Sequence, residues 1–165
     1  MSWWMGAGLG FLRGGPFGAV VGGVAEHFLG KKLKNKFHKS LPGIKKKGDY
    51  ITALVIVLTR VGIVNGSLVK EQVEVIKKFF RKNLDFGVED FKVIDSLIIE
   101  VQNKKPDLDR FVKMYKNSCQ NNYNLLLLAL CYQVSLVKSK LDEETEKLLK
   151  QVFLLLGLSY DQHNA

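Results

Sequence analysis

Residues 50–80 read YITALVIVLTRVGIVNGSLVKEQVEVIKKFF, a stretch whose character changes at its centre. Its first half is apolar at helical spacing, residues 64–68 form a polar turn, and its second half is apolar on one helical face only. Residues 123–153 read YNLLLLALCYQVSLVKSKLDEETEKLLKQVF and repeat this order at an offset of 73 positions. The aligned pairs include Tyr50 with Tyr123, Leu54 with Leu127, Val61 with Val134, Ile76 with Leu149 and Phe80 with Phe153. The sequence therefore predicts two helical hairpins related by a pseudo-twofold axis.

Helical periodicity continues through residues 49–165, which predicts a compact all-α bundle with this internal repeat. The expected helices span residues 49–64, 69–83, 88–103, 107–118, 124–137 and 142–156. Asp107 and Asp142 stand where helices begin, and Gly157 stands where the last helix ends. Because residues 124–137 are apolar nearly all round, we expect this helix to be the central and most buried one. Its residues 125–130 are expected to form core rather than a ligand groove.

Five glycines recur at every fourth position near the N-terminus, and they are Gly6, Gly10, Gly14, Gly18 and Gly22. This spacing places them on nearly one face of a helix. In a bilayer, small residues at this spacing allow two helix backbones to approach closely. The sequence predicts a glycine-zipper transmembrane helix that pairs with other helices and makes the protein a homodimer or larger oligomer.

Residues 5–25 are long enough to cross a hydrocarbon core, with Trp3 and Trp4 as interfacial anchors. Arg13 either reaches toward the headgroups or lies outside a span that begins near Gly14. A cleaved signal peptide is the alternative, but the basic cluster follows the apolar run instead of preceding it. A glycine-zipper peptide that perturbs membranes is a further alternative, which a large attached domain disfavours.

The net charge of +9 is concentrated just after this segment. Eight lysines and no acidic residue occur there: Lys31, Lys32, Lys34, Lys36, Lys39, Lys45, Lys46 and Lys47. By the positive-inside rule, this pattern predicts a single-pass protein of the cytoplasmic (inner) membrane, with its N-terminus outside and its C-terminal domain cytoplasmic. The lysines would lie against anionic lipid. A nucleic-acid-binding arm is the alternative, but the cluster lacks arginine and carries only Phe37 for stacking, so we expect no nucleic-acid partner.

Three segments follow from these patterns: a membrane anchor at 1–30, a polybasic juxtamembrane linker at 31–48 and a helical domain at 49–165. No nucleophile–base set and no phosphate-binding loop occurs in the sequence. Cys119 and Cys131 have no partner at metal-ligand spacing. We therefore expect a protein that is not an enzyme and has no cofactor.

The apolar helix, the turn Asn65-Gly66-x-Leu68-x-x-Glu71 and the following amphipathic helix resemble the TerB-like domain of tellurite-resistance proteins. The second copy ends in Leu156-Gly157-Leu158-Ser159, which is similar to the closing motif of that family. The N-terminus, with Trp3-Trp4, a Gly-rich apolar run and His27-Phe28, resembles the membrane anchor of DjlA-type J-domain co-chaperones. Those proteins carry an anchor, a TerB-like domain and a J domain in that order.

The chain departs from both resemblances. No His-Pro-Asp tripeptide of a J domain occurs, so direct stimulation of an Hsp70 is not expected of this chain. Some TerB-like proteins are thought to hold cations with clustered carboxylates in the turns. Here Asn65 replaces an aspartate beside Glu71, and Lys138 accompanies Glu144. These three degenerate candidates (Asn65, Glu71 and Glu144) lead us to expect no metal.

These features predict a membrane-anchored, non-enzymatic interaction module, similar to the N-terminal part of a DjlA-type DnaJ-like co-chaperone. It would self-associate through its glycine helix and recruit a protein partner of the Hsp70/J-domain system on the cytoplasmic face. The alternative is a TerB-like stress or tellurite-resistance protein that binds a divalent cation weakly.

Overall fold

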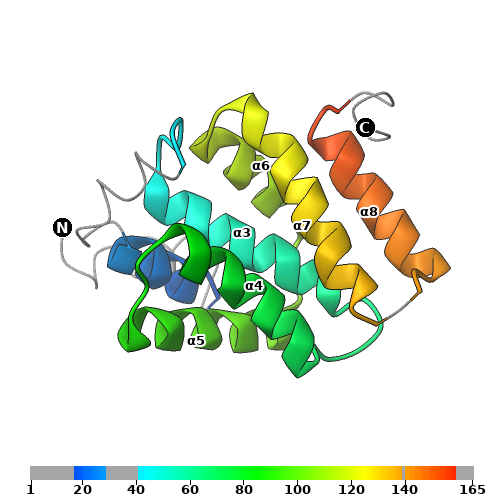
Figure 1. The fold of residues 1–165 in the computed structure, drawn as a ribbon, viewed down its shortest axis with the longest axis horizontal. Coiled ribbons are helices and arrows are strands. Elements are labelled where there is room, and N and C mark those ends of the chain that lie inside the picture. Colours follow the sequence, from blue (N-terminus) through cyan, green and yellow to red (C-terminus); the bar gives the residue numbers. More distant parts are fainter. Residues whose placement is uncertain (1–16, 29–40, 139, 159–165) are drawn as a thin grey trace.

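The computed structural model describes residues 17–28, 41–138 and 140–158 (Figure 1). A helix over residues 17–28 precedes the bundle. The remaining helices are α3 (Lys47–Gly62), α4 (Lys70–Asn83), α5 (Val88–Lys104), α6 (Leu108–Ser118), the short 3-10 helix η1 (Asn121–Tyr123), α7 (Asn124–Leu136) and α8 (Glu143–Leu155). The expectation of an all-α bundle is confirmed, and each expected helix of the bundle begins and ends within two residues of its observed bounds.

The helix ends follow from local chemistry. The Asp107 carboxylate accepts a hydrogen bond from the backbone N–H of Asp109 at 3.3 Å and caps α6. Asp142 does the same for α8, accepting from the N–H of Thr145 at 2.8 Å. After α8, Gly157 takes a φ of +70°, a left-handed conformation that glycine adopts without steric cost.

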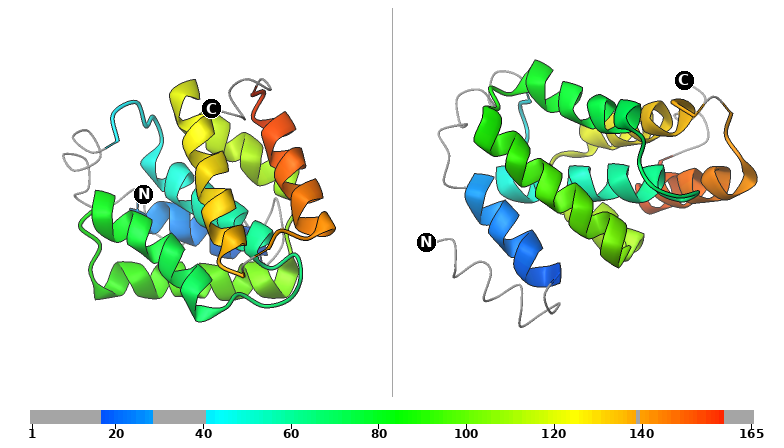
Figure 2. Two further views of the ribbon diagram at one scale, coloured as in Figure 1. Left: turned by 45° about the vertical axis from the view of Figure 1, so that its right-hand side comes forward. Right: turned by 90° about the horizontal axis from the view of Figure 1, so that it is seen from below.

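Helix α3 is the centre of the bundle, and α4, α5, α6, α7 and α8 all contact it (Figures 1 and 2). Thirteen of its sixteen residues are buried, including the β-branched run Val55, Ile56 and Val57. The expectation that the helix at 124–137 would be the central one is therefore wrong. Helix α7 leaves Leu125 and Leu136 more than two-fifths exposed because neighbours cover only part of its circumference.

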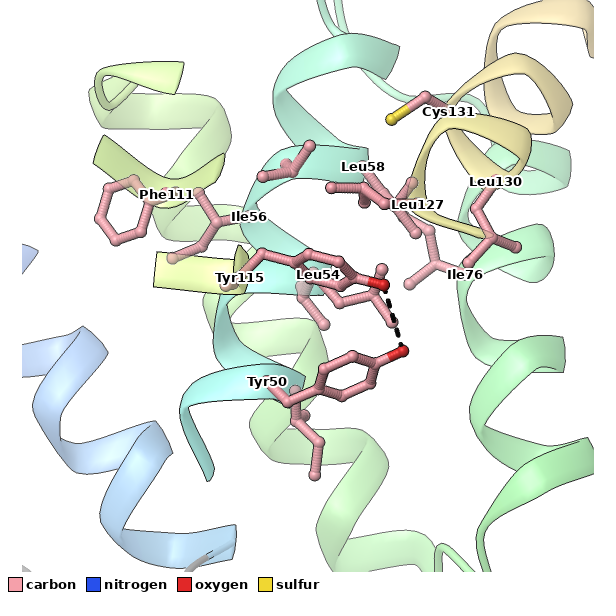
Figure 3. Close-up of a cluster of buried hydrophobic side chains, with 14 of the residues drawn as sticks. Tyr50, Leu54, Ile56, Leu58, Ile76, Phe111, Tyr115, Leu127, Leu130 and Cys131 are labelled. Atoms are coloured by element: carbon pink, nitrogen blue, oxygen red, sulfur yellow. Dashed lines mark hydrogen bonds between the residues drawn. The ribbon is translucent and has the colours of Figure 1, made fainter. Parts of the chain in front are cut away.

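Buried tyrosines fasten the start of α3 to α6 and η1 (Figure 3). The hydroxyls of Tyr50 and Tyr115 lie 3.4 Å apart, and the Tyr115 hydroxyl donates to the carbonyl of Tyr123 at 2.8 Å. The Tyr123 hydroxyl in turn donates to the carbonyl of Pro42. Burial raises the pKa of both Tyr50 and Tyr115, so their hydroxyls stay protonated and serve as hydrogen-bonding groups.

The last part of the expected linker belongs to the bundle. Leu41 is 5% exposed, and the backbone N–H of Lys45 donates to the carbonyl of Ser118 at 2.8 Å. Helix α3 begins at Lys47, two residues before the expected start of the helical domain. The folded unit therefore includes residues 41–48, which the sequence had assigned to a juxtamembrane linker.

The helix of residues 17–28 packs against α3 and α5, as Figure 2 shows. Its Val21, Val24 and Phe28 belong to the same hydrophobic core as α3, and Phe28 is fully buried. The Phe28 ring stacks on Phe86 with 5.1 Å between centroids. His27 Nε2 lies 3.2 Å from the carboxylate of Asp90 at the start of α5.

This packing bears on the expected membrane span at residues 5–25, of which the structure describes only the last nine. In those nine residues, Val21 and Val24 face protein rather than lipid. Within residues 17–28, 41–138 and 140–158, no helix has both the length and the apolar character that a bilayer crossing requires. The remainder of the expected span lies outside the described residues.

Candidate functional site

The two polar turns of the repeat meet in space, although they are far apart in the sequence. The Asn65 side-chain amide donates to the carboxylate of Asp142 and, at 3.3 Å, to the hydroxyl of Thr145. The Lys138 ammonium donates to the carbonyl of Ser67 at 3.3 Å. A polar cavity of about 210 Å³ lies between the turns, and its lining includes Asn65, Lys138 and Asp142.

The buried side chain of Gln72 links the two hairpins beside this junction through two hydrogen bonds. The Gln72 amide nitrogen donates to the carbonyl of Val134 at 3.1 Å, and its oxygen accepts from the N–H of Val69 at 3.0 Å. Val134 lies in the last turn of α7, where carbonyls have no partner within their own helix. Gln72 therefore joins the end of the second apolar helix to the start of α4. The residue 73 positions later, Thr145, is also buried.

The donor set of this cavity does not fit a hard cation. Calcium and magnesium take several carboxylate or carbonyl oxygens, whereas Asp142 is the single carboxylate here and Lys138 and Lys140 also line the space. Hydrogen bonds from the backbone and hydroxyl of Thr145, together with nearby Lys138, lower the pKa of Asp142. Its negative charge is thus already compensated by protein groups.

Glu71 and Glu144 are exposed in the first turns of α4 and α8, and neither lines the cavity. Among the described residues, no group of three or more His, Cys, Asp or Glu side chains is arranged to share a metal ion. Of the three degenerate metal candidates, the structure brings only Asn65 into this junction.

The candidates for membrane contact fall mostly outside the described residues. Gly6, Gly10, Gly14, Lys31, Lys32, Lys34, Lys36 and Lys39 are all in that group. Gly18 is buried and Gly22 half-buried on the helix of residues 17–28, while Lys45 and Lys46 are exposed and Lys47 is half-buried where α3 begins. Helix pairing and membrane contact by these residues remain predictions.

A larger hollow, called here the α4–α7 groove, runs between the amphipathic helix of the first hairpin and the apolar helix of the second. Its volume is about 810 Å³. Apolar side chains from both helices and from the preceding segment line it: Leu41, Val75, Phe79, Leu126, Leu130 and Leu136. The expectation that residues 125–130 are core rather than groove holds for Leu127, Leu128 and Leu130, which are buried, although Leu130 also lines the groove. It is wrong for Leu125, which is 43% exposed, and for the half-buried Leu126, which lines the groove.

The basic residues of α4 divide by their position around the helix. Lys77 pairs with Asp95 of α5 at 2.7 Å, and Arg81 pairs with Glu74 at 2.6 Å, both away from the groove. Lys78 and Lys82 line the groove, are exposed, and form no ion pair with any described residue. The groove thus combines an apolar floor with two uncompensated positive charges.

Sequence reasoning missed the groove, although one signal for it was present: residues 124–137 are apolar nearly all round. In the structure the neighbours of α7 do not cover all of this surface, and Leu136 remains 49% exposed. The repeat-equivalent residue in the first hairpin, Ile63 at the C-cap of α3, is only 4% exposed. A second helix that is apolar on most of its faces indicates apolar surface beyond what one neighbouring helix can cover.

Neither cysteine has the properties of a nucleophile. Both are buried free thiols. Burial raises the pKa of Cys119 to about 11 and also raises that of Cys131, so both remain in the unreactive protonated form.

Comparison with known protein families gives a match to the family described as Tellurite resistance protein TerB over residues 51–165. The match begins at the fifth residue of α3 and extends beyond α8, so it covers most of the first hairpin, all of the second and both turns. No curated protein and no solved structure shows a significant match to the chain.

Proposed function

This chain belongs to the TerB family of tellurite-resistance proteins, and from that premise we propose that it is a non-enzymatic module that binds another protein. The observation that carries the proposal is the α4–α7 groove, a hollow of about 810 Å³ whose floor is apolar and whose edge carries Leu136, 49% exposed. Concave apolar sites bordered by polar residues are typical of interaction sites. The buried, protonated cysteines and the charge-compensated turn junction supply no reactive group to either hollow.

The test uses a photo-crosslinking amino acid in the full chain, expressed in its own cells. At Gln133, an exposed residue that lines the groove, it should give discrete adducts of higher mass. At Asn117, an exposed residue of α6, it should give none. Absence of adducts at Gln133, or the same adducts at both positions, would contradict the proposal.

The proposal extends to a membrane-anchored form that resembles the N-terminal part of a DjlA-type co-chaperone, with a J domain on another chain. Its support is the glycine spacing at Gly6–Gly22 and the lysine cluster that follows it. Insertion of residues 5–25 would require Val21 and Val24 to leave the core. Alkaline carbonate extraction of membranes from cells expressing the full chain distinguishes a membrane-inserted N-terminal segment from one that is not inserted. Retention in the pellet supports an integral anchor, and release contradicts it.

The alternative is a stress or tellurite-resistance role in which the bundle binds a divalent cation weakly. Family membership favours it, but the donors at the turn junction oppose it. Thermal unfolding of the full chain with excess calcium or with EDTA distinguishes the two. We expect the same melting temperature in both, and a rise of several degrees with calcium would establish the alternative.

A further inference from the structure

The charged residues of the α4–α7 groove indicate which chemical class of partner would bind there. Among the residues that the structure describes, the charged ones that line the groove are Lys78 and Lys82 of α4. No acidic side chain of residues 17–28, 41–138 and 140–158 lines it. Both lysine side chains are exposed, so they can pair with an incoming group without leaving a partner behind.

The spacing of the two lysines favours a helix over a lipid as the ligand of the groove. Residues four apart on a helix lie one turn, about 6 Å, from each other on the same face. Acidic residues four apart on a second helix have the same separation. A fatty acid carries one carboxylate and would leave one lysine without a partner. A helix can meet both lysines and also cover the apolar floor.

We propose that the α4–α7 groove binds an amphipathic helix of a partner protein, with acidic residues one turn apart facing Lys78 and Lys82. This inference rests on the proposed function and names the chemistry of its partner. The apolar face of the partner helix lies on the accessible lining residues Val75, Leu126 and Leu136, with anchors at the i, i+3, i+4 and i+7 spacing of helix-in-groove recognition. The two ion pairs set its orientation and register.

The probe is a synthetic alanine-based helix of about 16 residues, with leucines at i, i+3, i+4 and i+7. Two glutamates four residues apart border its leucine face. A matched peptide carries lysines in place of the glutamates. Binding to the purified full chain is followed by fluorescence anisotropy of the labelled peptide. The glutamate peptide should bind at least tenfold more tightly than the lysine peptide.

Charge-reversed proteins provide the controls. The double variant Lys78→Glu/Lys82→Glu should weaken the glutamate peptide about tenfold and should bind the lysine peptide more tightly than the parent chain does. The variant Lys113→Glu/Lys150→Glu has the same change in net charge on exposed residues of α6 and α8, and should leave both affinities unchanged. Since all four lysines are exposed, both proteins should fold.

Three results would overturn the inference. The first is no binding of the glutamate peptide, or equal binding by the parent and the Lys78→Glu/Lys82→Glu variant. The second is displacement of a groove-bound dye by palmitate and not by the peptide, which would assign a lipid. The third is a dimer in light scattering that Leu136→Glu dissolves, which would assign a second copy of this chain. Crosslinking at Gln133 would still support the proposed function if only the peptide test failed.

Discussion

The two hairpins share one sequence pattern but have different surroundings. In the first, α3 is enclosed by helices on all sides, and Leu54 and Ile63 are buried. In the second, α7 occupies the equivalent place in the repeat, yet Leu136 is 49% exposed and Leu126 faces the α4–α7 groove.

A repeated sequence pattern therefore does not imply that the equivalent residues are equally buried. The helix of residues 17–28 and α5 cover the first apolar helix, and no described helix covers the corresponding face of the second. The uncovered face of α7 is where we place the binding of a partner.

Truncating an enclosed leucine should cost far more than truncating an exposed one. We expect Leu54→Ala in α3 to lower the free energy of unfolding by about 3 kcal/mol, because a cavity remains in a packed core. Leu136→Ala in α7 should change it by less than about 0.5 kcal/mol. Urea unfolding monitored by circular dichroism measures both. Similar losses in the two variants would mean that α7 is covered in solution.

Displacing the helix of residues 17–28 from α3 should leave part of α3 exposed, as part of α7 is. A Cβ at Gly48 would lie 2.3 Å from the carbonyl oxygen of Ala25, so Gly48→Ala must push the helix of residues 17–28 away. We expect a loss of about 1–3 kcal/mol and faster amide hydrogen exchange in residues 17–28. Gly87→Ala is the control, because the nearest atom to its Cβ would be 3.8 Å away. Unchanged exchange in Gly48→Ala would contradict the observed docking.

The buried polar residues Gln72 and Thr145, at equivalent positions of the repeat, should differ in how much they contribute to the free energy of unfolding. Gln72→Leu leaves the Val134 carbonyl and the Val69 N–H without their partner, and should cost about 2 kcal/mol. Thr145→Val removes the 3.3 Å contact to Asn65 and the hydrogen bond of the hydroxyl to Asp142, but both lie near solvent, so it should cost only about 0.5–1 kcal/mol. Thermal unfolding of both variants gives the order, and a larger loss in Thr145→Val would reverse our account of the junction.

The smallest effect concerns the charge of Asp142. Since folding lowers its pKa from the ordinary 3.8, its charge stabilises the fold above that value, and this contribution is lost as the pH falls through the lower folded pKa. Asp142→Asn keeps a capping side chain and removes the charge. We expect it to melt slightly below the parent at neutral pH, with the difference vanishing in acid. A difference that persists in acid would assign the effect to the cap instead.

The bundle helices were predictable from the sequence because apolar residues recur at helical spacing and several helices carry a capping residue at one end. Asp107, Asp142 and Gly157 mark boundaries that the structure confirms. The TerB resemblance was readable for the same reason, since its turn and closing motifs lie at those boundaries. The DjlA-type anchor rests on residues that the structure describes only in part.

Other features could not be predicted, because periodicity identifies an apolar face and not its partner. An apolar, glycine-rich helix has one pattern whether it lies in lipid or on protein, so the docking of Phe28 was not foreseen. The same ambiguity made α7 appear more enclosed than α3. The groove lysines were not distinguishable from Lys77 and Arg81 until the structure showed which of them are paired.

The contact between His27 and Asp90 also sets an order of events during protein synthesis. The two residues are 63 positions apart, and the ring that stacks on Phe28 belongs to Phe86. On the ribosome, the chain emerges from its N-terminus, so residues 17–28 are outside the ribosome before Phe86 and Asp90, which they contact, have been released. During that interval the apolar side chains of this helix, Val21, Val24 and Phe28 among them, have no folded surface to cover them.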